Sequence, residues 1–253
     1  MAKVGTNIGL VNHAKKALSL KTVYMWGGIL RLVEKQYETL LTIYGNQSGT
    51  GYTAERWNKL RQMFGKNIYG VDCVGLIKSY LWSGKTDGGT GSPYYGKSGY
   101  PPDIPAGSMY NAATEKGPIS TLPEIPGIIV YCRTYPHVGV YIGNGEVIES
   151  TLSSRGDGVV KTKLSAFKWE HWFKCPYIDY VEDKATENTG AAFKTGDRVK
   201  IKSSAETYAG INTKIPAGYK GNAKTYTVSR VKEDRVLLNE LYSWVFIKDI
   251  TKV

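Results

Sequence analysis

The spacing of apolar residues changes near residue 127, and this change limits the folds that the chain can adopt. Before it, apolar residues recur at helical spacing, and we expect helices at residues 7–20, 30–44, 54–64 and 73–82. After it, short segments alternate apolar and polar residues, and we expect strands at residues 127–132, 137–142, 146–150, 158–162 and 175–180. Helices followed by antiparallel strands predict an α+β domain.

A loop-rich stretch lies between the predicted helices and strands. Residues 83–126 are rich in Gly, Pro, Ser and Tyr and predict surface loops around one short helix at residues 106–114. Loops of this length are unusual in a compact domain unless they line a functional site. We therefore expect this stretch to border such a site.

A small, polar segment divides the chain. Residues 181–192 have the composition of a linker, so we expect one domain at residues 1–180 and a second at residues 193–253. The second part alternates apolar and polar residues throughout, with Gly and Pro turns in between. This pattern predicts a small all-β module, most simply a barrel.

The chain is basic, with a net charge of +11 from 33 basic and 22 acidic residues, and the excess is found in both predicted domains. Nucleic acid, an anionic membrane surface and the teichoic acids of a bacterial wall are all compatible with this charge. No apolar run of about 18 residues occurs, so we expect no membrane span. Residues 1–20 lack the apolar core of a signal peptide.

The three cysteines cannot all pair, and the three histidines are not spaced as zinc ligands. We therefore expect free thiols in a protein made in a reducing cytoplasm, with no metal and no cofactor.

Cys73 is the candidate nucleophile. It lies at the start of the predicted helix at residues 73–82, directly after Asp72, a favourable capping residue. The free N–H groups and the dipole of a helix start stabilise a thiolate. The alternative is a small thiol buried in a core helix.

A thiolate needs a base, and histidine is scarce. His137 opens a predicted strand, where a buried sheet would fix its position, so it is the candidate base. We expect His13 to be exposed on the first helix. We expect His171 to pack beside the neighbouring tryptophans, Trp169 and Trp172.

The hairpin after His137 allows a geometric test of whether an acidic residue, Glu149, can orient the candidate base. A two-residue loop at 144–145 would turn Glu149 to the face opposite His137. A three-residue loop at 143–145 instead pairs Glu149 with Gly139 and places it within side-chain reach of His137. A carboxylate there would orient the imidazole and stabilise its charged form. The alternative is that Glu149 is an exposed residue of the strand with no role in the site.

These residues resemble a known family. The segments Asp72-Cys73-Val74-Gly75-Leu76-Ile77 and His137-Val138-Gly139-Val140-Tyr141-Ile142-Gly143-Asn144-Gly145 look like those of the NlpC-type cysteine peptidases that cut bacterial peptidoglycan. The resemblance implies a papain-like domain in which Cys73, His137 and Glu149 form the catalytic triad.

A third segment, Tyr24-Met25-Trp26-Gly27-Gly28, resembles the family's upstream motif, whose tyrosine lies near the nucleophile. The resemblance makes Tyr24 and Asp72 candidates for oxyanion and substrate binding. The sequence differs from the family pattern in three ways. Val74 replaces a serine, and the third triad member is a glutamate. About 40 residues of helix and loop, called here the insertion (residues 29–68), separate the Tyr24 segment from the Cys73 motif, far more than is usual.

The C-terminal part is similar to bacterial SH3-like wall-binding domains at residues 195–201 and 243–247. The resemblance implies that aromatic side chains contact glycan or teichoic acid, and we expect Tyr208, Tyr226 and Trp244 to do so.

Together the resemblances imply an endolysin that cuts a stem-peptide bond of peptidoglycan through an acyl-enzyme, made in the host cytoplasm and acting on the wall after release. Nucleic acid is then not an expected partner. Three alternatives stay open: an N-acetylmuramoyl-L-alanine amidase with the same triad, a non-catalytic basic protein that binds wall or nucleic acid, and a transferase that uses the same thioester. The sequence leaves open the bond, the wall type and the oligomeric state.

Overall fold

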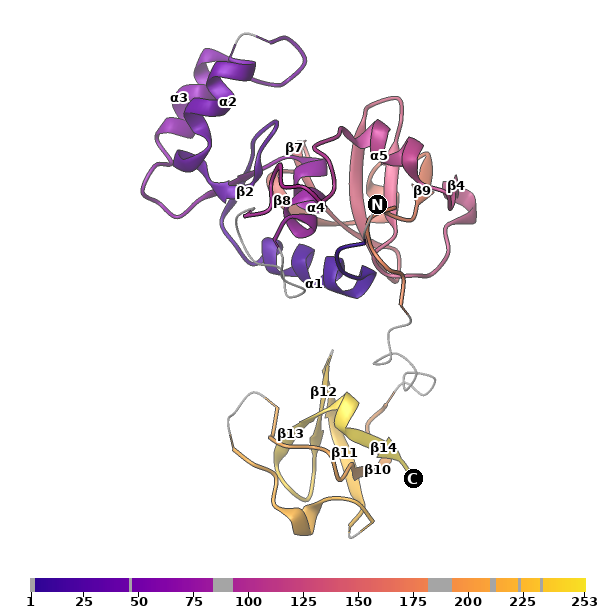
Figure 1. The fold of residues 1–253 in the computed structure, drawn as a ribbon. Helices are drawn as coiled ribbons and strands as arrows, with labels where there is room; N and C mark the ends of the chain where they lie inside the picture. Colours follow the sequence, from indigo (N-terminus) through magenta and orange to yellow (C-terminus); the bar gives the residue numbers. More distant parts are fainter. Residues whose placement is uncertain are drawn as a thin grey trace. The chain divides into compact units, whose positions relative to one another are not determined.

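The computed structural model describes residues 3–45, 47–83, 93–181, 193–209, 213–222, 224–232 and 234–253 (Figure 1). The chain divides into two compact units, Met1–Val181 and Glu182–Val253, called here the N-terminal and the C-terminal unit. The predicted linker lies, apart from Val181, outside the described residues. The predicted mixture of helices and antiparallel strands is confirmed. No helix within the described ranges is long and apolar enough to cross a membrane.

The helices of the N-terminal unit are α1 (Asn7–Leu18), α2 (Tyr37–Tyr44), α3 (Ala54–Arg61), α4 (Cys73–Leu81) and α5 (Ala106–Ala112), with short 3₁₀ helices η1 (Val33–Lys35), η2 (Ile119–Thr121) and η3 (Leu164–Ala166). Its strands are β1 (Thr22–Tyr24), β2 (Ile29–Leu32), β3 (Tyr69–Val71), β4 (Lys116–Pro118), β5 (Ile129–Cys132), β6 (His137–Gly143), β7 (Glu146–Ser153), β8 (Gly156–Lys163) and β9 (His171–Phe173).

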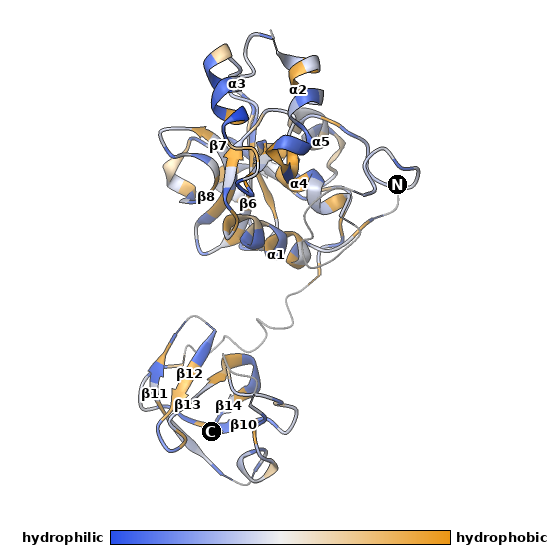
Figure 2. Cartoon of the chain, turned by 90° about the vertical axis from the view of Figure 1, so that its left-hand side faces the viewer, coloured by the Kyte–Doolittle hydropathy of each residue, from blue (hydrophilic) through white to orange (hydrophobic). Residues whose placement is uncertain are grey.

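The main sheet of this unit has the strand order β4-β9-β5-β6-β7-β8, with antiparallel pairing between neighbours. Helix α4 packs on β6 and β7, and every residue of α4 is buried. Figure 2 shows the hydrophobic colouring of α4, β6 and β7 in the interior, whereas α3 is largely hydrophilic. The helix that begins with Cys73 and the strand that begins with His137 therefore share one apolar core.

A smaller sheet with the order β1-β3-β2 leads into α4. Strand β1 runs parallel to β3, so that Tyr24 stands opposite Val71, two residues before Cys73. The sequence did not indicate β3. The helix expected at residues 30–44 is wrong in its first part, because Ile29–Leu32 pairs with β3 as β2 and the α-helix begins only at Tyr37. Pairing with a distant strand outweighs local helical periodicity here.

Helices α2 and α3 lie side by side at one end of the N-terminal unit (Figure 1). They enclose a hydrophobic cluster of their own, made of Val23, Met25, Val33, Tyr37, Leu40, Trp57 and Leu60. Thr53 caps α3, and its hydroxyl accepts a hydrogen bond from the Arg56 N–H at 3.0 Å.

The predicted strand at residues 175–180 is wrong. This segment lies along the N-terminus, where Asp179 forms an isolated bridge with Thr6, and the Tyr180 hydroxyl donates to the Gly127 carbonyl at 3.0 Å. The sheet instead takes its strand β9 from His171–Phe173.

The C-terminal unit contains β10 (Arg198–Ile201), β11 (Tyr226–Val231), β12 (Arg235–Leu238), β13 (Ser243–Phe246) and β14 (Ile250–Lys252), with 3₁₀ helices η4 (Ala217–Tyr219) and η5 (Ile247–Asp249). The strands pair in the order β13-β12-β11-β10-β14. The all-β prediction is confirmed, β14 was not expected, and the SH3-like barrel stays a prediction.

Candidate active site

Cys73 opens α4. Asp72 before it has an extended backbone and caps the helix, accepting a hydrogen bond from the Gly75 N–H at 2.5 Å. Position 75 requires glycine, because an added Cβ would lie 1.9 Å from the Gly28 carbonyl oxygen. The helix start therefore contacts the turn that follows Tyr24.

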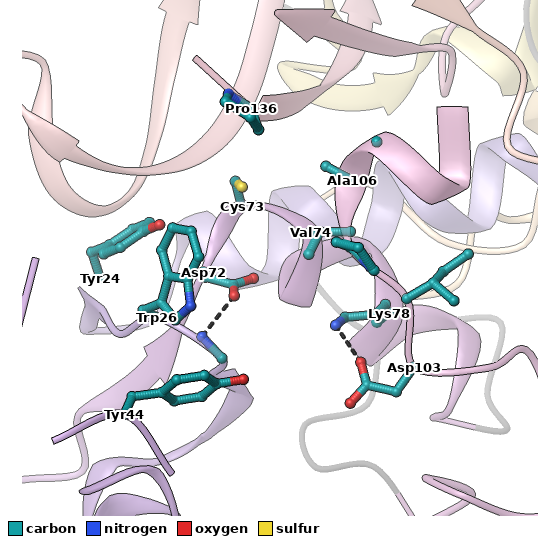
Figure 3. A pocket seen from close by; sticks show the side chains of 14 residues that line it. Tyr24, Trp26, Tyr44, Asp72, Cys73, Val74, Lys78, Asp103, Ala106 and Pro136 are labelled. Carbon is teal, nitrogen blue, oxygen red and sulfur yellow. Dashed lines mark hydrogen bonds and ion pairs between the residues drawn. The ribbon is translucent and has the colours of Figure 1, made fainter. Parts of the chain in front are cut away.

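Asp72 also ties this turn to the helix. Its second carboxylate oxygen accepts a hydrogen bond from the Gly27 N–H at 2.7 Å (Figure 3). Burial raises the pKa of Asp72, and the nearby Lys78 charge and the two N–H bonds oppose that rise. Because both oxygens accept from backbone, the role of Asp72 visible here is to hold the turn beside Cys73.

His137 begins β6, and the predicted register between β6 and β7 is confirmed. Val140 pairs with Ile148, which places Glu149 opposite Gly139 on the face of His137. An added Cβ at Gly139 would lie 2.5 Å from the Val147 side chain, so glycine leaves the room that this close packing needs.

The loop that produces this register differs from the predicted three-residue loop. The turn is two residues long, Asn144 and Gly145, with φ values of +55° and +69°, and Gly143 pairs with Glu146. An irregularity in β6 between Tyr141 and Gly143 then shifts the register. A tight turn and a bulge together reach the pairing that a longer loop would give.

Glu149 is fully buried and carries a network of hydrogen bonds. Its Oε2 lies 2.6 Å from His137 Nε2 and accepts from Arg155 Nη2 at 3.0 Å. Its Oε1 accepts from Arg155 Nε at 3.1 Å and from the Thr162 hydroxyl at 2.9 Å. Burial alone would raise the pKa of Glu149, but the hydrogen bonds from His137 and Arg155 prevail and lower it to about 2. The carboxylate is therefore charged, and the exposed-residue alternative does not apply.

The Cys73 thiol faces the His137 imidazole closely enough to raise the pKa of the ring. Nε2 is engaged by Glu149, which leaves Nδ1 as the ring nitrogen that faces sulfur. Burial lowers the pKa of His137, but the interactions with Cys73 and Glu149 outweigh it and raise the pKa to about 9. The Trp169 ring stacks on the imidazole at 5.4 Å and 13°, which fixes its plane. The imidazole can therefore hold a proton beside the Cys73 sulfur at neutral pH.

Two cavities meet at this pair. The first, of about 270 Å³, is lined by residues that include Cys73, Lys78 and Asp103, and Figure 3 shows the Cys73 sulfur below Pro136. The second, of about 500 Å³, is lined by residues that include His137 and Arg155. Tyr24, Trp26 and Pro136 line both cavities. The space on both sides of Cys73 and His137 can thus accommodate an extended ligand.

Tyr24 is half-buried on the shared wall of the two cavities. Burial, together with the neighbouring Cys73 and Asp72, raises the pKa of its phenol well above the usual value. The hydroxyl therefore stays protonated and can donate a hydrogen bond.

The other two histidines lie outside the site. The expected exposure of His13 is wrong: it is fully buried between α1 and α4, and its Nε2 lies 2.7 Å from the Ser79 hydroxyl. Burial lowers its pKa to about 4, so it is neutral. His171 packs against Tyr110, with ring centroids 5.3 Å apart.

Sequence reasoning missed Arg155 and Thr162. Thr162 carries a faint signal, because it stands two residues from Val160, the partner of Glu149 in β8, and alternation puts it on the same face. Arg155 follows β7 in a turn, where no periodicity indicates a direction.

The predicted wall contacts in the C-terminal unit need correction. Tyr208 and Tyr226 are 9% and 2% exposed and belong to the hydrophobic cluster of that unit, so their rings cannot present a binding surface. Trp244 is half-exposed, and the Lys232 ammonium lies 5.0 Å from its ring centroid.

Two solved structures are similar to this chain. One is the peptidoglycan hydrolase RipB from Mycobacterium tuberculosis, with 18% sequence identity and a TM-score of 0.40, and the match covers 69% of this chain and 65% of that one. The other is the P60 domain of an antigen from M. avium subspecies paratuberculosis, with 19% identity, a TM-score of 0.37, and 69% and 98% of the two chains covered.

The chain thus spans less than two thirds of the RipB structure. No protein-family model matches the sequence, and no curated protein matches it.

Proposed function

We propose that the N-terminal unit is a cysteine hydrolase of the NlpC/P60 type that cuts a peptide bond in the stem peptide of peptidoglycan. The observation that carries this proposal is the buried Glu149 carboxylate hydrogen-bonded to His137, whose imidazole faces the Cys73 thiol beside two adjoining cavities. A carboxylate, an imidazole and a thiol in this order are the groups that covalent acyl transfer requires.

In the proposed reaction His137 accepts the Cys73 proton, and the thiolate attacks the carbonyl carbon of the scissile bond. The negative charge on the carbonyl oxygen is stabilised by donors at the start of α4, whose first N–H groups have no partner within the helix, and by the Tyr24 hydroxyl. The imidazolium then gives its proton to the leaving amine. Water, deprotonated by His137, releases the acid product from sulfur.

The C-terminal unit is proposed to bind wall polymers and to concentrate the hydrolase near its substrate. Three features support this role: its basic composition, its half-exposed Trp244 and the neighbouring Lys232. The anionic groups of peptidoglycan and of teichoic acid are both candidate ligands for a basic surface.

The proposal is tested with purified bacterial walls and three proteins: wild type, Cys73→Ala and Cys175→Ala. Cys175 is the matched control, because it is a fully buried cysteine whose pKa burial raises to about 12. Wild type and Cys175→Ala should clear the walls, and Cys73→Ala should lose at least about 10³-fold in rate. Clearing by Cys73→Ala at the wild-type rate would overturn the mechanism.

Mass spectrometry of the released fragments identifies the bond. New peptide termini within the stem peptide support the peptidase proposal. Release of whole stem peptides from intact glycan strands would show instead that the enzyme is an amidase.

A further inference from the structure

The insertion at residues 29–68 takes no direct part in the chemistry proposed above, yet one of its helices reaches the site. Helix α3 carries Arg56, whose side chain is only 8% exposed. A guanidinium so deeply buried is costly unless its charge and its N–H groups find partners. The partners of Arg56 therefore indicate what the insertion does.

Arg56 forms a two-pronged ion pair with Asp157 of β8. Nη1 donates to Oδ2 and Nη2 donates to Oδ1, both at 2.7 Å. Lys59 adds a third bond to Oδ2 at 3.1 Å from a more exposed position. Burial would raise the pKa of Asp157, but the hydrogen bonds from Arg56 and Lys59 prevail and lower it to about 2. The pair thus stays charged across the neutral range.

The backbone of Tyr24 lies between the two charged groups. Its N–H donates to Asp157 Oδ1 at 3.0 Å, and its carbonyl accepts from Arg56 Nη2 at 2.5 Å. Strand β1 is the edge of its sheet, with β3 on its other side. The ion pair therefore satisfies the outward backbone groups of Tyr24, as a further strand would do.

The insertion holds the next part of the turn as well. The Tyr52 hydroxyl donates to the Trp26 carbonyl at 2.8 Å, and the Tyr52 ring stacks on Trp57 of α3 at 3.9 Å. Tyr24 and Trp26 line both cavities beside Cys73. The segment at residues 29–68 thus fixes the wall that the two cavities share.

We propose that Arg56 and Asp157 are positioning residues, which clamp the Tyr24 backbone so that its hydroxyl is held at the oxyanion position beside Cys73. This inference rests on the proposed function, because Tyr24 has a catalytic role only if Cys73 attacks a carbonyl. The insertion is then part of the active site, since it delivers one half of the clamp.

The test is a double-mutant cycle measured with a soluble stem-peptide substrate. Arg56→Met should lower kcat by about 10- to 100-fold and change KM by less than about threefold, because a misplaced donor weakens transition-state binding more than substrate binding. Asp157→Asn, which keeps the shape of the carboxylate, should produce a smaller loss. Arg56→Lys should recover part of kcat.

The dependence of the Arg56→Met effect on the Tyr24 hydroxyl distinguishes a positioning role of Arg56 from a general structural role. In a Tyr24→Phe background, Arg56→Met should cost less than about a further threefold in kcat, because the donor it would position is already absent. The control is Arg61→Met, on the same helix with an exposed side chain, which should stay within about twofold of wild type. All variants in the cycle must have thermal unfolding midpoints above the assay temperature. If Arg56→Met does not fold, Asp157→Asn replaces it in the cycle.

The outcomes are distinct. An equal loss of kcat in both backgrounds, or a wild-type kcat for Arg56→Met, would overturn the clamp while leaving the hydrolase intact. A wild-type protein that cleaves neither walls nor stem peptides would refute the proposed function itself.

Discussion

The two units of this chain bury different kinds of side chain. The N-terminal unit encloses ionisable groups such as Glu149, Asp72 and Arg56, each with charged or N–H partners. In the described parts of residues 193–253, the buried side chains are apolar or aromatic, and ion pairs such as Arg235–Asp234 lie at the surface.

This difference has an energetic meaning. A buried charge costs several kcal/mol in desolvation. We therefore expect buried charges where the geometry that they fix serves a function. Glu149 orients His137, and Arg56 is proposed to hold Tyr24 in place. An apolar core imposes no such directional constraint, so any binding by the C-terminal unit must come from its surface. The comparison predicts that equivalent substitutions will have unequal effects in the two units.

The largest difference should appear between Glu149→Ala and Glu240→Ala. Removing Glu149 leaves Arg155 and His137 without their buried acceptor, and we expect a loss of about 3–5 kcal/mol in the free energy of unfolding. Glu240 is exposed and accepts from Thr227, so its removal should cost about 1 kcal/mol or less. Urea unfolding followed by circular dichroism measures both values.

Equal losses in the free energy of unfolding for Glu149→Ala and Glu240→Ala would contradict the comparison between the two units. Burial would then not determine how much stability each substitution removes. Glu149→Gln serves as the intermediate case. It preserves the volume of the side chain and removes its charge, so its stability should lie between those of Glu149→Ala and wild type.

The second effect concerns pH. The interactions with Cys73 and Glu149 raise the pKa of His137 to about 9 against the effect of burial. A base with a raised pKa keeps its proton to higher pH, and the proposed reaction needs that proton for the leaving amine. We therefore expect kcat/KM to fall as the pH rises through about 9.

Glu149→Gln removes one of the two partners that raise this pKa, so the alkaline limb should move to lower pH, toward the ordinary histidine value. Glu240→Gln is the matched control and should leave the limb in place. An alkaline limb that does not respond to Glu149→Gln would mean that another group controls it.

Much of the candidate triad could be predicted because its members lie on elements with strong local patterns. Helical periodicity after Asp72 indicated where α4 begins, and alternation around His137 indicated β6. The register was correct although the loop was not, because a tight turn plus a bulge gives the same pairing as a longer loop. Period-two alternation then defined the face on which Glu149 lies.

Contacts that depend on distant parts of the chain could not be predicted in this way. Arg56 and Asp157 are separated by 101 residues, and the local sequence of neither indicates the other. The mistaken helix at residues 30–44 has the same origin, because β2 exists only through its pairing with β3. Periodicity describes one element at a time, whereas these features arise between elements.

The smallest expected effect concerns the surface of the C-terminal unit, where the sequence-based choice of Tyr208 and Tyr226 is wrong because both rings are buried in the core. Half-exposed Trp244, with the Lys232 ammonium 5.0 Å from its ring centroid, is the remaining candidate for wall binding.

Trp244→Ala should weaken binding to purified walls, measured by sedimentation, by up to about tenfold, the range of a single aromatic contact. Hydrolysis of a soluble stem peptide should not change, since Trp244 lies outside the unit that contains Cys73. Tyr242→Ala, at an 85% exposed neighbour, tests whether Trp244 is specifically required. If it alone weakens wall binding, the contact lies at residue 242 instead, and if neither variant weakens binding, this surface of the C-terminal unit does not hold the wall.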